Sequence, residues 1–179
     1  MFICNHITLA DHALVLFALP SKFKSRMAIA QDGELLREWR HPPGHTGLFT
    51  RMIYLFQYVS VVLFFNVFAM PRKSGFRRSF AFAGEMTDRG YNLLVFPEGK
   101  RTEDGTMKAF RLGTGLLIHE LGAPVVPMRI DGLWELKQKN RHFAWPGEVS
   151  VSVGKPIQYS AQAKPEEIVK DLAERVREL

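Results

Sequence analysis

Cysteine is almost absent from this sequence of 179 residues, in which Cys4 is the single example. One thiol excludes an internal disulfide and a zinc site made of four cysteines. Such low cysteine usage also fits a reducing, cytosolic environment. Tyrosine and tryptophan are scarce as well, at 4 and 3 residues against 14 phenylalanines. This apolar aromatic content argues against a nucleic acid stacked on aromatic rings and favours a lipid partner.

Two sequence patterns are also missing. The opening residues, MFICNH, contain no basic start followed by a long apolar run, so we expect neither a signal peptide nor a membrane anchor there. The chain instead opens inside a predicted strand, which leads us to expect a domain cut from a longer protein. No Gly-x-Ser-x-Gly elbow occurs, so a serine nucleophile is not supported.

Length and charge narrow the class further. A chain of this length buries about two-thirds of the surface that its unfolded form exposes, so we expect a single domain over 1–179. Lysine and arginine number 24 against 18 acidic residues, which gives a formal charge of +6. This excess favours an anionic partner, and a nucleic acid, a phospholipid surface and a phosphorylated substrate all qualify.

Short apolar runs predict strands, and apolar residues at helical spacing predict helices. A basic loop at 22–31 is expected to enter another strand, and the breaker cluster at 41–47 is expected to be a loop. The remaining expected strands are 2–4, 92–96, 124–130 and 148–153. The expected helices are 11–17, 74–90, 113–121 and 165–179, the last with Ile168, Leu172, Val176 and Leu179 on its buried face.

Strands that alternate with helices predict an α/β fold with a mixed, largely parallel sheet flanked by helices. Active and binding sites in such folds lie at the carboxyl ends of the strands. Two polar motifs, at 5–11 and 96–102, each follow directly on a predicted strand. We therefore look for the functional site in these two motifs.

The uncharged run at 52–70 is the longest apolar stretch in the chain. Its length lies at the lower edge of what crosses a bilayer as a helix. Three interpretations are open: a buried helix that leads into a core strand, an interfacial or partly embedded element, and a true membrane span. A span is the least favoured, because it would place the two polar motifs on opposite sides of the membrane.

The first motif places His6 and Asp11 on either side of a strand-to-helix turn. Such a turn can fold the carboxylate back against the imidazole. A carboxylate bonded to one ring nitrogen fixes the tautomer and leaves the other nitrogen free to take a proton from a substrate hydroxyl. The alternative is a histidine with only a structural role in the turn, beside an aspartate that caps the helix.

Metal and covalent chemistry find little support elsewhere in the sequence. Cys4 lies in a predicted strand with no activating partner beyond its neighbour His6, so a covalent intermediate on the thiol is not supported. The remaining histidines have no spacing typical of a metal site, and we expect no metal. These histidines are His12, His41, His45, His119 and His142.

The second motif, FPEGKRT at 96–102, turns from a strand end through proline and glycine into two adjacent cations. Cations and exposed backbone N–H groups at a turn are typical of a phosphate site, although a solvated charged turn has the same composition. Arg111 adds a cation and Gly113 a close-packing residue downstream. Arg72 follows the apolar run at 52–70, where a lipid head group would meet water.

In this order the motifs resemble the glycerophospholipid (1-acyl-sn-glycerol-3-phosphate) acyltransferase family over nearly the whole chain. The first block of the family, Asn-His-x4-Asp, resembles 5–11. The third, Phe-Pro-Glu-Gly-x-Arg-Ser/Thr, is matched by 96–102, with Lys100 where threonine is more usual. The fourth, an apolar run ending in proline, resembles 125–127. Of the second block, Gly-x-x-Phe-x-x-Arg, only Arg72 fits well.

The resemblance implies a glycerol-3-phosphate acyltransferase-like fold and an O-acyltransferase activity. The enzyme would move a fatty acyl group from acyl-CoA or acyl carrier protein to the free hydroxyl of a lysophospholipid, above all 1-acylglycerol-3-phosphate, giving phosphatidate without a further cofactor. It also implies that His6 is the general base and Asp11 its orienting partner. The residues implied to bind the acceptor are Arg72, Glu98, Gly99, Lys100 and Arg101.

The same resemblance implies partners and a location. The chain is similar to acyltransferase domains fused to adenylate-forming fatty acid ligases, so an acyl-activating domain is an expected fused or separate partner. The expected location is the cytoplasmic face of a membrane, with peripheral or partly embedded attachment. Two other classes stay open: a catalytically silent lipid-binding or membrane-docking domain, and a basic nucleic-acid-binding domain. The second lacks a zinc finger or an aromatic-rich RNA motif, and we expect no nucleic acid.

Overall fold

The computed structural model describes residues 1–70, 76–137 and 147–179. Within these ranges the chain forms two compact units. The N/C unit combines Met1–Ser25 with Val95–Leu179, and the middle unit is Arg26–Leu94. The expected single domain over the whole chain stays a prediction.

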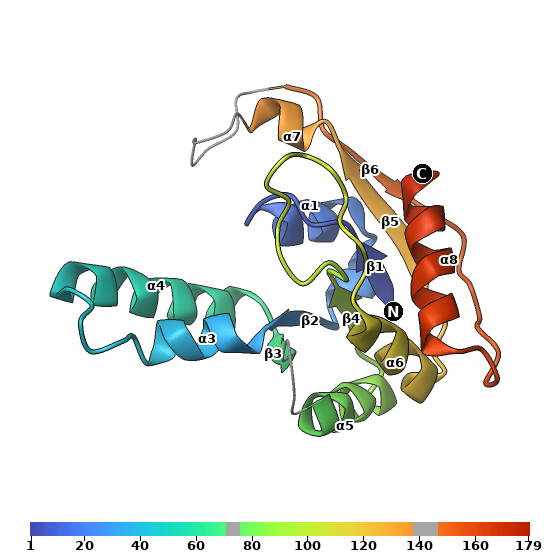
Figure 1. The fold of residues 1–179 in the computed structure, drawn as a ribbon, viewed down its shortest axis with the longest axis horizontal. Helices are drawn as coiled ribbons and strands as arrows, with labels where there is room; N and C mark the ends of the chain where they lie inside the picture. The colour runs from blue at the N-terminus through green and yellow to red at the C-terminus, as the bar shows by residue number, and fades with distance from the viewer. Residues whose placement is uncertain (71–75, 138–146) are drawn as a thin grey trace. The chain divides into compact units, whose positions relative to one another are not determined.

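Three strands form the sheet of the N/C unit in the order β1-β5-β6 (Figure 1). The first, β1 (Phe2–Cys4), pairs in parallel with β5 (Val126–Asp131), and all three of its residues are buried. At the edge, β6 (Ser150–Val153) pairs with β5 in the antiparallel direction. Because β1 is covered on both faces, an uninterrupted apolar run is what its environment requires.

The helices of the N/C unit were mostly expected from sequence, except for α2 and α7. The predicted stop of α6 at Gly122 is confirmed, since this glycine has a φ of 55° at the end of the helix. The basic stretch at 22–31 begins with the short helix α2 rather than with a loop. The helices are α1 (Asp11–Ala18), α2 (Ser21–Lys24), α6 (Leu112–Leu121), α7 (Leu133–Leu136) and α8 (Pro165–Arg177).

Helix α8 packs against both α6 and β5. A Cβ atom on Gly115 of α6 would lie 2.3 Å from the carbonyl oxygen of Pro165, so only glycine permits this close approach. The buried face of α8 includes the predicted Ile168, Leu172 and Val176. The prediction for Leu179 is wrong: the helix ends at Arg177, and Leu179 is exposed.

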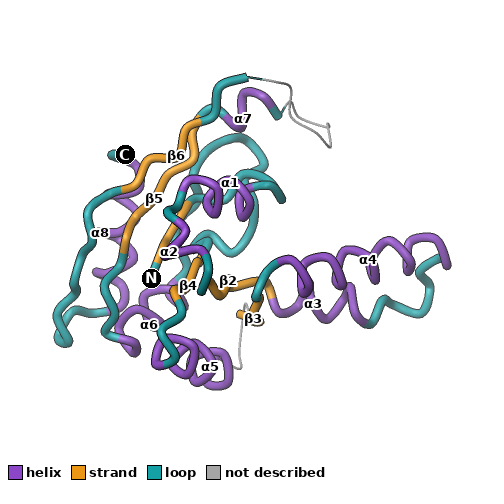
Figure 2. The backbone as a smooth tube through the Cα atoms, turned by 180° about the vertical axis from the view of Figure 1, so that it is seen from behind, coloured by secondary structure: helices purple, strands orange, loops and turns teal. Residues whose placement is uncertain are grey.

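In the middle unit, a three-stranded parallel sheet has the order β3-β2-β4 (Figure 2). The central strand, β2 (Met27–Asp32), pairs with β3 (Val67–Met70) on one side and with β4 (Asn92–Val95) on the other. Helix α5 (Phe76–Asp88) packs against β3, and the predicted stop at Gly90 is confirmed by a φ of 77°. The predicted α/β class, with largely parallel pairing and flanking helices, is confirmed.

Two helices of the middle unit pack side by side, α3 (Gly33–Arg40) and α4 (Leu48–Phe64). The loop expected at 41–47 joins them (Figures 1 and 2). No residue among 48–63 is buried, so the interpretation of 52–70 as a buried helix is wrong, while the strand that follows it, β3, is correct. None of the helices in the described ranges has the length and hydropathy needed to cross a membrane.

Candidate active site

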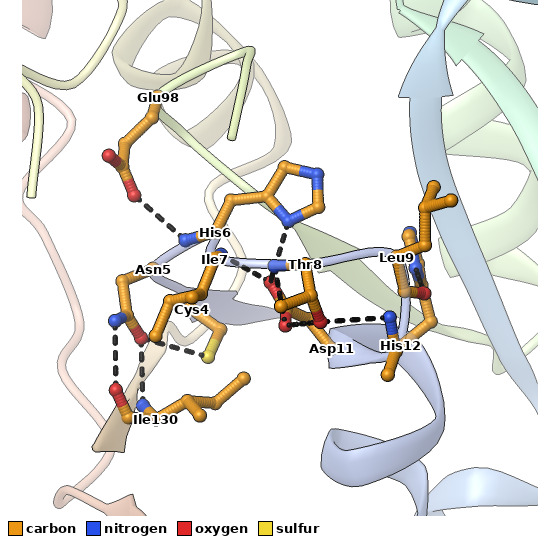
Figure 3. Close-up of polar contacts among 11 residues, drawn as sticks. Cys4, Asn5, His6, Ile7, Thr8, Leu9, Asp11, His12, Glu98 and Ile130 are labelled. Carbon is orange, nitrogen blue, oxygen red and sulfur yellow. Dashed lines mark hydrogen bonds and ion pairs between the residues drawn. The ribbon is translucent and has the colours of Figure 1, made fainter. Parts of the chain in front are cut away.

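The first motif starts where β1 ends, beside β5. Asn5 is buried, and its side chain continues the pairing of the two strands like an extra backbone unit. Its Nδ2 atom donates to the carbonyl oxygen of Ile130 at 3.0 Å, and its Oδ1 atom accepts from the Ile130 N–H at 2.8 Å (Figure 3). The residue before His6 is therefore held on the sheet by two hydrogen bonds.

The predicted contact between His6 and Asp11 is present. The Nδ1 atom of the imidazole lies 2.8 Å from Oδ2 of Asp11, which is the first residue of α1 and is completely buried. The carboxylate also accepts from the backbone N–H groups of Ile7 and Thr8 and from the Thr8 hydroxyl. These hydrogen bonds hold the Asp11 carboxylate in place beside the imidazole.

This geometry selects one tautomer of His6. A proton on Nδ1 donates to the Asp11 carboxylate, so Nε2 carries the lone pair and is able to accept a proton. Figure 3 shows this second nitrogen directed away from Asp11, and no hydrogen bond joins it to any residue in the described ranges. The arrangement is that of a general base with its orienting acid.

Aromatic rings fix the plane of the imidazole. Phe96, the last residue before the second turn, stacks on His6 with ring centroids 4.5 Å apart and planes inclined by 30°. The ring of His12 stands edge-on to both, at 5.8 Å from His6 and 4.9 Å from Phe96. No role was expected for His12 from sequence, although it follows Asp11 directly.

The second motif contacts the first through its backbone and through Glu98. Oε1 of Glu98 accepts from the backbone N–H of His6 at 2.8 Å, and Oε2 accepts from the N–H of Lys108 at 2.7 Å. The N–H of Thr102 donates to the carbonyl oxygen of His6 at 2.9 Å. Burial raises the pKa of Glu98, and the two backbone donors act in the opposite direction. The two motifs thus form one site within the N/C unit.

The cations of the second motif have different surroundings. Lys100 lies 3.3 Å from Glu103, which also pairs with Lys108 at 3.3 Å. Arg101 is exposed and has no hydrogen bond or ion pair with another residue that the structure describes. Gly99, with a φ of 68°, lies against the side chain of Arg111. Arg72, the remaining residue expected at the site, lies outside the described residues.

A cavity of about 500 Å³ adjoins His6. Its wall includes residues that were not expected from sequence, because neither motif contains them; among them are Met107, Arg129 and Trp134. Arg129 lies within β5, inside the strand predicted at 124–130, and its Nε atom donates to Asp131 at 2.7 Å. Arg129 could have been singled out from sequence, because it is a cation in a largely apolar strand. Nothing in the sequence distinguishes Met107 or Trp134 as a residue of the site.

Comparison of the sequence with known protein families identifies the family of this chain. The chain matches the Acyltransferase family over residues 1–131. The chain belongs to the Acyltransferase family. The matched range contains both motifs of the site, from Asn5 to Asp11 and from Phe96 to Thr102.

Two relatives in this family carry the acceptor in their names. The chain is 31% identical over 80 residues to a chloroplastic 1-acyl-sn-glycerol-3-phosphate acyltransferase of Brassica napus, covering 44% of this chain and 23% of that protein. It is 32% identical over 86 residues to the mouse 1-acyl-sn-glycerol-3-phosphate acyltransferase alpha, covering 48% and 30%. The chain thus matches less than a third of the length of either relative.

A solved acyltransferase structure has the same fold. The crystal structure of the 1-acyl-sn-glycerophosphate (LPA) acyltransferase PlsC from Thermotoga maritima aligns with a TM-score of 0.69 and 24% identity. The alignment covers 99% of this chain and 62% of PlsC. The expected acyltransferase-like fold is therefore confirmed for this member of the family.

The state of the Cys4 thiol and the question of a metal ion both bear on the chemistry of this acyltransferase-family site. Burial raises the pKa of the Cys4 thiol well above its ordinary value, and nearby Asp11 and Glu98 add to the effect. The thiol is therefore held in its unreactive, protonated form. No group of three or more histidine, cysteine, aspartate or glutamate side chains in the described ranges is placed to hold a metal ion. A reaction without metal stays a prediction.

Proposed function

We propose that this chain is the catalytic domain of an O-acyltransferase that acylates the free hydroxyl of a lysophospholipid, above all 1-acylglycerol-3-phosphate, to give phosphatidate. The acyl donor is acyl-CoA or acyl carrier protein, and an acyl-activating domain is a fused or separate partner. The observation that carries the proposal is the 2.8 Å contact between Nδ1 of His6 and the buried Asp11. A silent lipid-binding domain has no need of this contact.

The reaction follows from the orientation of His6. The acceptor oxygen attacks the carbonyl carbon of the thioester while Nε2 takes the hydroxyl proton. Asp11 remains ionised and stabilises the imidazolium. When the tetrahedral intermediate collapses, the carbon–sulfur bond breaks and the proton passes from Nε2 to the leaving sulfur. No bond to the protein forms, in agreement with the inert Cys4.

Phosphate binding is proposed for the cations of the second motif. Arg101 is the best placed, because Lys100 already shares Glu103 with Lys108, whereas Arg101 has no such partner within the described ranges. A guanidinium binds phosphate through two parallel hydrogen bonds. Gly99 contributes through the shape of the turn. Arg72 is a further cation expected from the family resemblance to bind the acceptor. The resemblance implies the same for Glu98, whose carboxylate contacts the backbone of His6 and Lys108.

A membrane surface is the proposed location of the substrates and of the enzyme. Helix α4 exposes large apolar side chains, among them Phe49 (77% exposed), Phe56 (73%) and Leu63 (74%). Its single charged residue is Arg51, and the neighbouring α3 carries two arginines and two glutamates. An exposed apolar helix face of this size favours binding at a bilayer interface. We expect peripheral attachment at the cytoplasmic face.

Replacement of His6 tests the activity. The 179-residue chain and its His6→Ala variant are incubated in detergent micelles with 1-acylglycerol-3-phosphate and either acyl-CoA or acyl carrier protein as donor. Mass spectrometry then measures phosphatidate. Loss of the general base should lower the rate by about 10²–10⁴-fold. Replacement of the exposed His119 by alanine is the matched control and should leave the rate unchanged.

Two results would contradict the proposal. The first is a folded His6→Ala variant, as judged by circular dichroism, that retains the wild-type rate. The second is a wild-type chain that transfers no acyl group from either donor to any member of a mixed lysophospholipid pool.

A further inference from the structure

The main chain of His6 is held on both sides by the second motif. Glu98 accepts from its N–H at 2.8 Å, and the N–H of Thr102 donates to its carbonyl oxygen at 2.9 Å. His6 and Glu98 are separated by 92 positions in the sequence. The peptide that carries the proposed base is thus fixed by a distant loop, in addition to the bond from its own ring to Asp11.

Both carboxylate oxygens of Glu98 are engaged with backbone. While Oε1 accepts from His6, Oε2 accepts from the N–H of Lys108 at 2.7 Å. The carbonyl oxygen of Glu98 in turn accepts from Nε of Arg111 at 3.1 Å. The residue is only 3% exposed. Glu98 lines the cavity beside His6, yet each of its carboxylate oxygens is already bonded to a main-chain donor.

Ionised Glu98 suits this task better than a neutral side chain. A carboxylate has acceptor sites on both oxygens, and its bonds to N–H groups are charge-assisted. An amide of the same shape has one acceptor oxygen and an NH₂ group. In a glutamine at position 98, the NH₂ group would face the N–H of either His6 or Lys108, which are both donors, so one bond would be lost.

We propose that Glu98 is a positioning residue, which acts through the backbone of His6 rather than by contacting the acceptor. This inference rests on the proposed function, because it assigns the role of Glu98 in that reaction. Displacement of a reacting group by about 1 Å costs on the order of 10²-fold in rate. Weakening of the bond between Glu98 and His6 should therefore lower kcat and leave acceptor binding unaffected.

The first test compares Glu98→Gln with Arg101→Ala in steady-state kinetics with 1-acylglycerol-3-phosphate. Glu98→Gln should lower kcat by about 10–10²-fold with KM for the acceptor within about twofold of wild type. Arg101→Ala should show the opposite pattern, a raised KM with little change in kcat, because it removes ground-state binding. A raised KM with unchanged kcat in Glu98→Gln would overturn the proposal.

The second test needs no activity, so it separates failure of this inference from failure of the proposed function. In ¹⁵N-labelled protein without substrate, Glu98→Gln should shift the backbone amide and ring signals of His6, together with the amide signal of Lys108. Arg101→Ala should leave the His6 signals in place. Unchanged His6 signals in Glu98→Gln, whatever its kcat, would overturn the proposal.

A third variant covers the case in which Glu98→Gln does not fold. Glu98→Asp keeps the charge but shortens the side chain by one methylene, so it should hold one backbone donor at a time. The expected result is a smaller loss of kcat at wild-type KM and a displaced His6 amide signal. Wild-type kcat with an unmoved His6 signal would show that the contact has no positioning role.

Discussion

Gly99 and Arg111 lie so close together that a Cβ atom on residue 99 would stand 2.3 Å from Nε of the arginine. The same Nε atom donates to the carbonyl oxygen of Glu98 at 3.1 Å. In addition, Gly99 has a φ of 68°, which other residues adopt only with strain. The glycine of the second motif is therefore required by the fold of its turn, independently of any substrate.

Replacement of Gly99 by alanine should destabilise the protein by about 1–3 kcal/mol, because the methyl group adds backbone strain and displaces Arg111. The midpoint of urea unfolding measures the change. Gly44→Ala is the matched control: a Cβ atom added there would meet no atom within 4 Å, and the expected effect is within about 0.5 kcal/mol. Equal midpoints for the two variants would contradict the role assigned to Arg111.

Asp11→Asn should lower kcat by about 10²–10⁴-fold. The asparagine side chain can present its NH₂ group to Nδ1 of His6, which then places the ring proton on Nε2, where the reaction needs a lone pair. Steady-state transfer of the acyl group measures the effect. Asp171→Asn is the control, because Asp171 also accepts two side-chain hydrogen bonds, from Tyr159 and Arg175, but lies on α8. A rate as high as that of the control would refute the orienting role of Asp11.

Sequence periodicity predicted most of the fold because burial imposes it. Apolar patterns in the sequence predicted the strand β1 and most of the buried face of α8. Helix α3 was missed, although Asp32 caps its N-terminus through bonds from the N–H groups of Glu34 and Leu35. The exposure of α4 was not predictable, because its apolar residues fix a helix and carry no information about what covers it.

The part of the candidate site formed by residues close in sequence was predictable. His6 and Asp11 are joined by a single turn, so their contact follows from the spacing and the strand-to-helix boundary. The bond from Glu98 to the His6 N–H joins a side chain to a backbone group, and backbone groups leave no mark in the sequence. The bond from the Thr102 N–H to the His6 carbonyl oxygen was not predictable for the same reason, because it joins two backbone groups. The family resemblance supplied the residues of the second motif, and the structure shows their contacts.

The loop after the second motif should make stability depend on acid pH. Hydrogen bonds from Thr106 and Thr102 to Asp104 lower the pKa of this carboxylate from 3.8 to about 2. Since the folded pKa lies below the unfolded one, the stabilisation is complete above about pH 4 and is lost as the pH falls towards 2. Urea midpoints measured between pH 5 and 2 should fall more steeply for wild type than for Asp104→Asn. Parallel curves would contradict the assignment.

The exposed face of α4 provides a test of membrane binding. Full burial of a phenylalanine side chain in an apolar environment contributes about 1.5–3 kcal/mol, so loss of one ring from the interface should weaken binding by about tenfold or more. We expect this for Phe56→Ser in sedimentation with vesicles of equal parts phosphatidylglycerol and phosphatidylcholine. Phe17→Ser, at an even more exposed phenylalanine of α1 (87%), is the control and should bind like wild type. If both variants bind as wild type does, α4 does not dock on the bilayer; if Phe17→Ser alone loses binding, the docking surface belongs to the N/C unit instead.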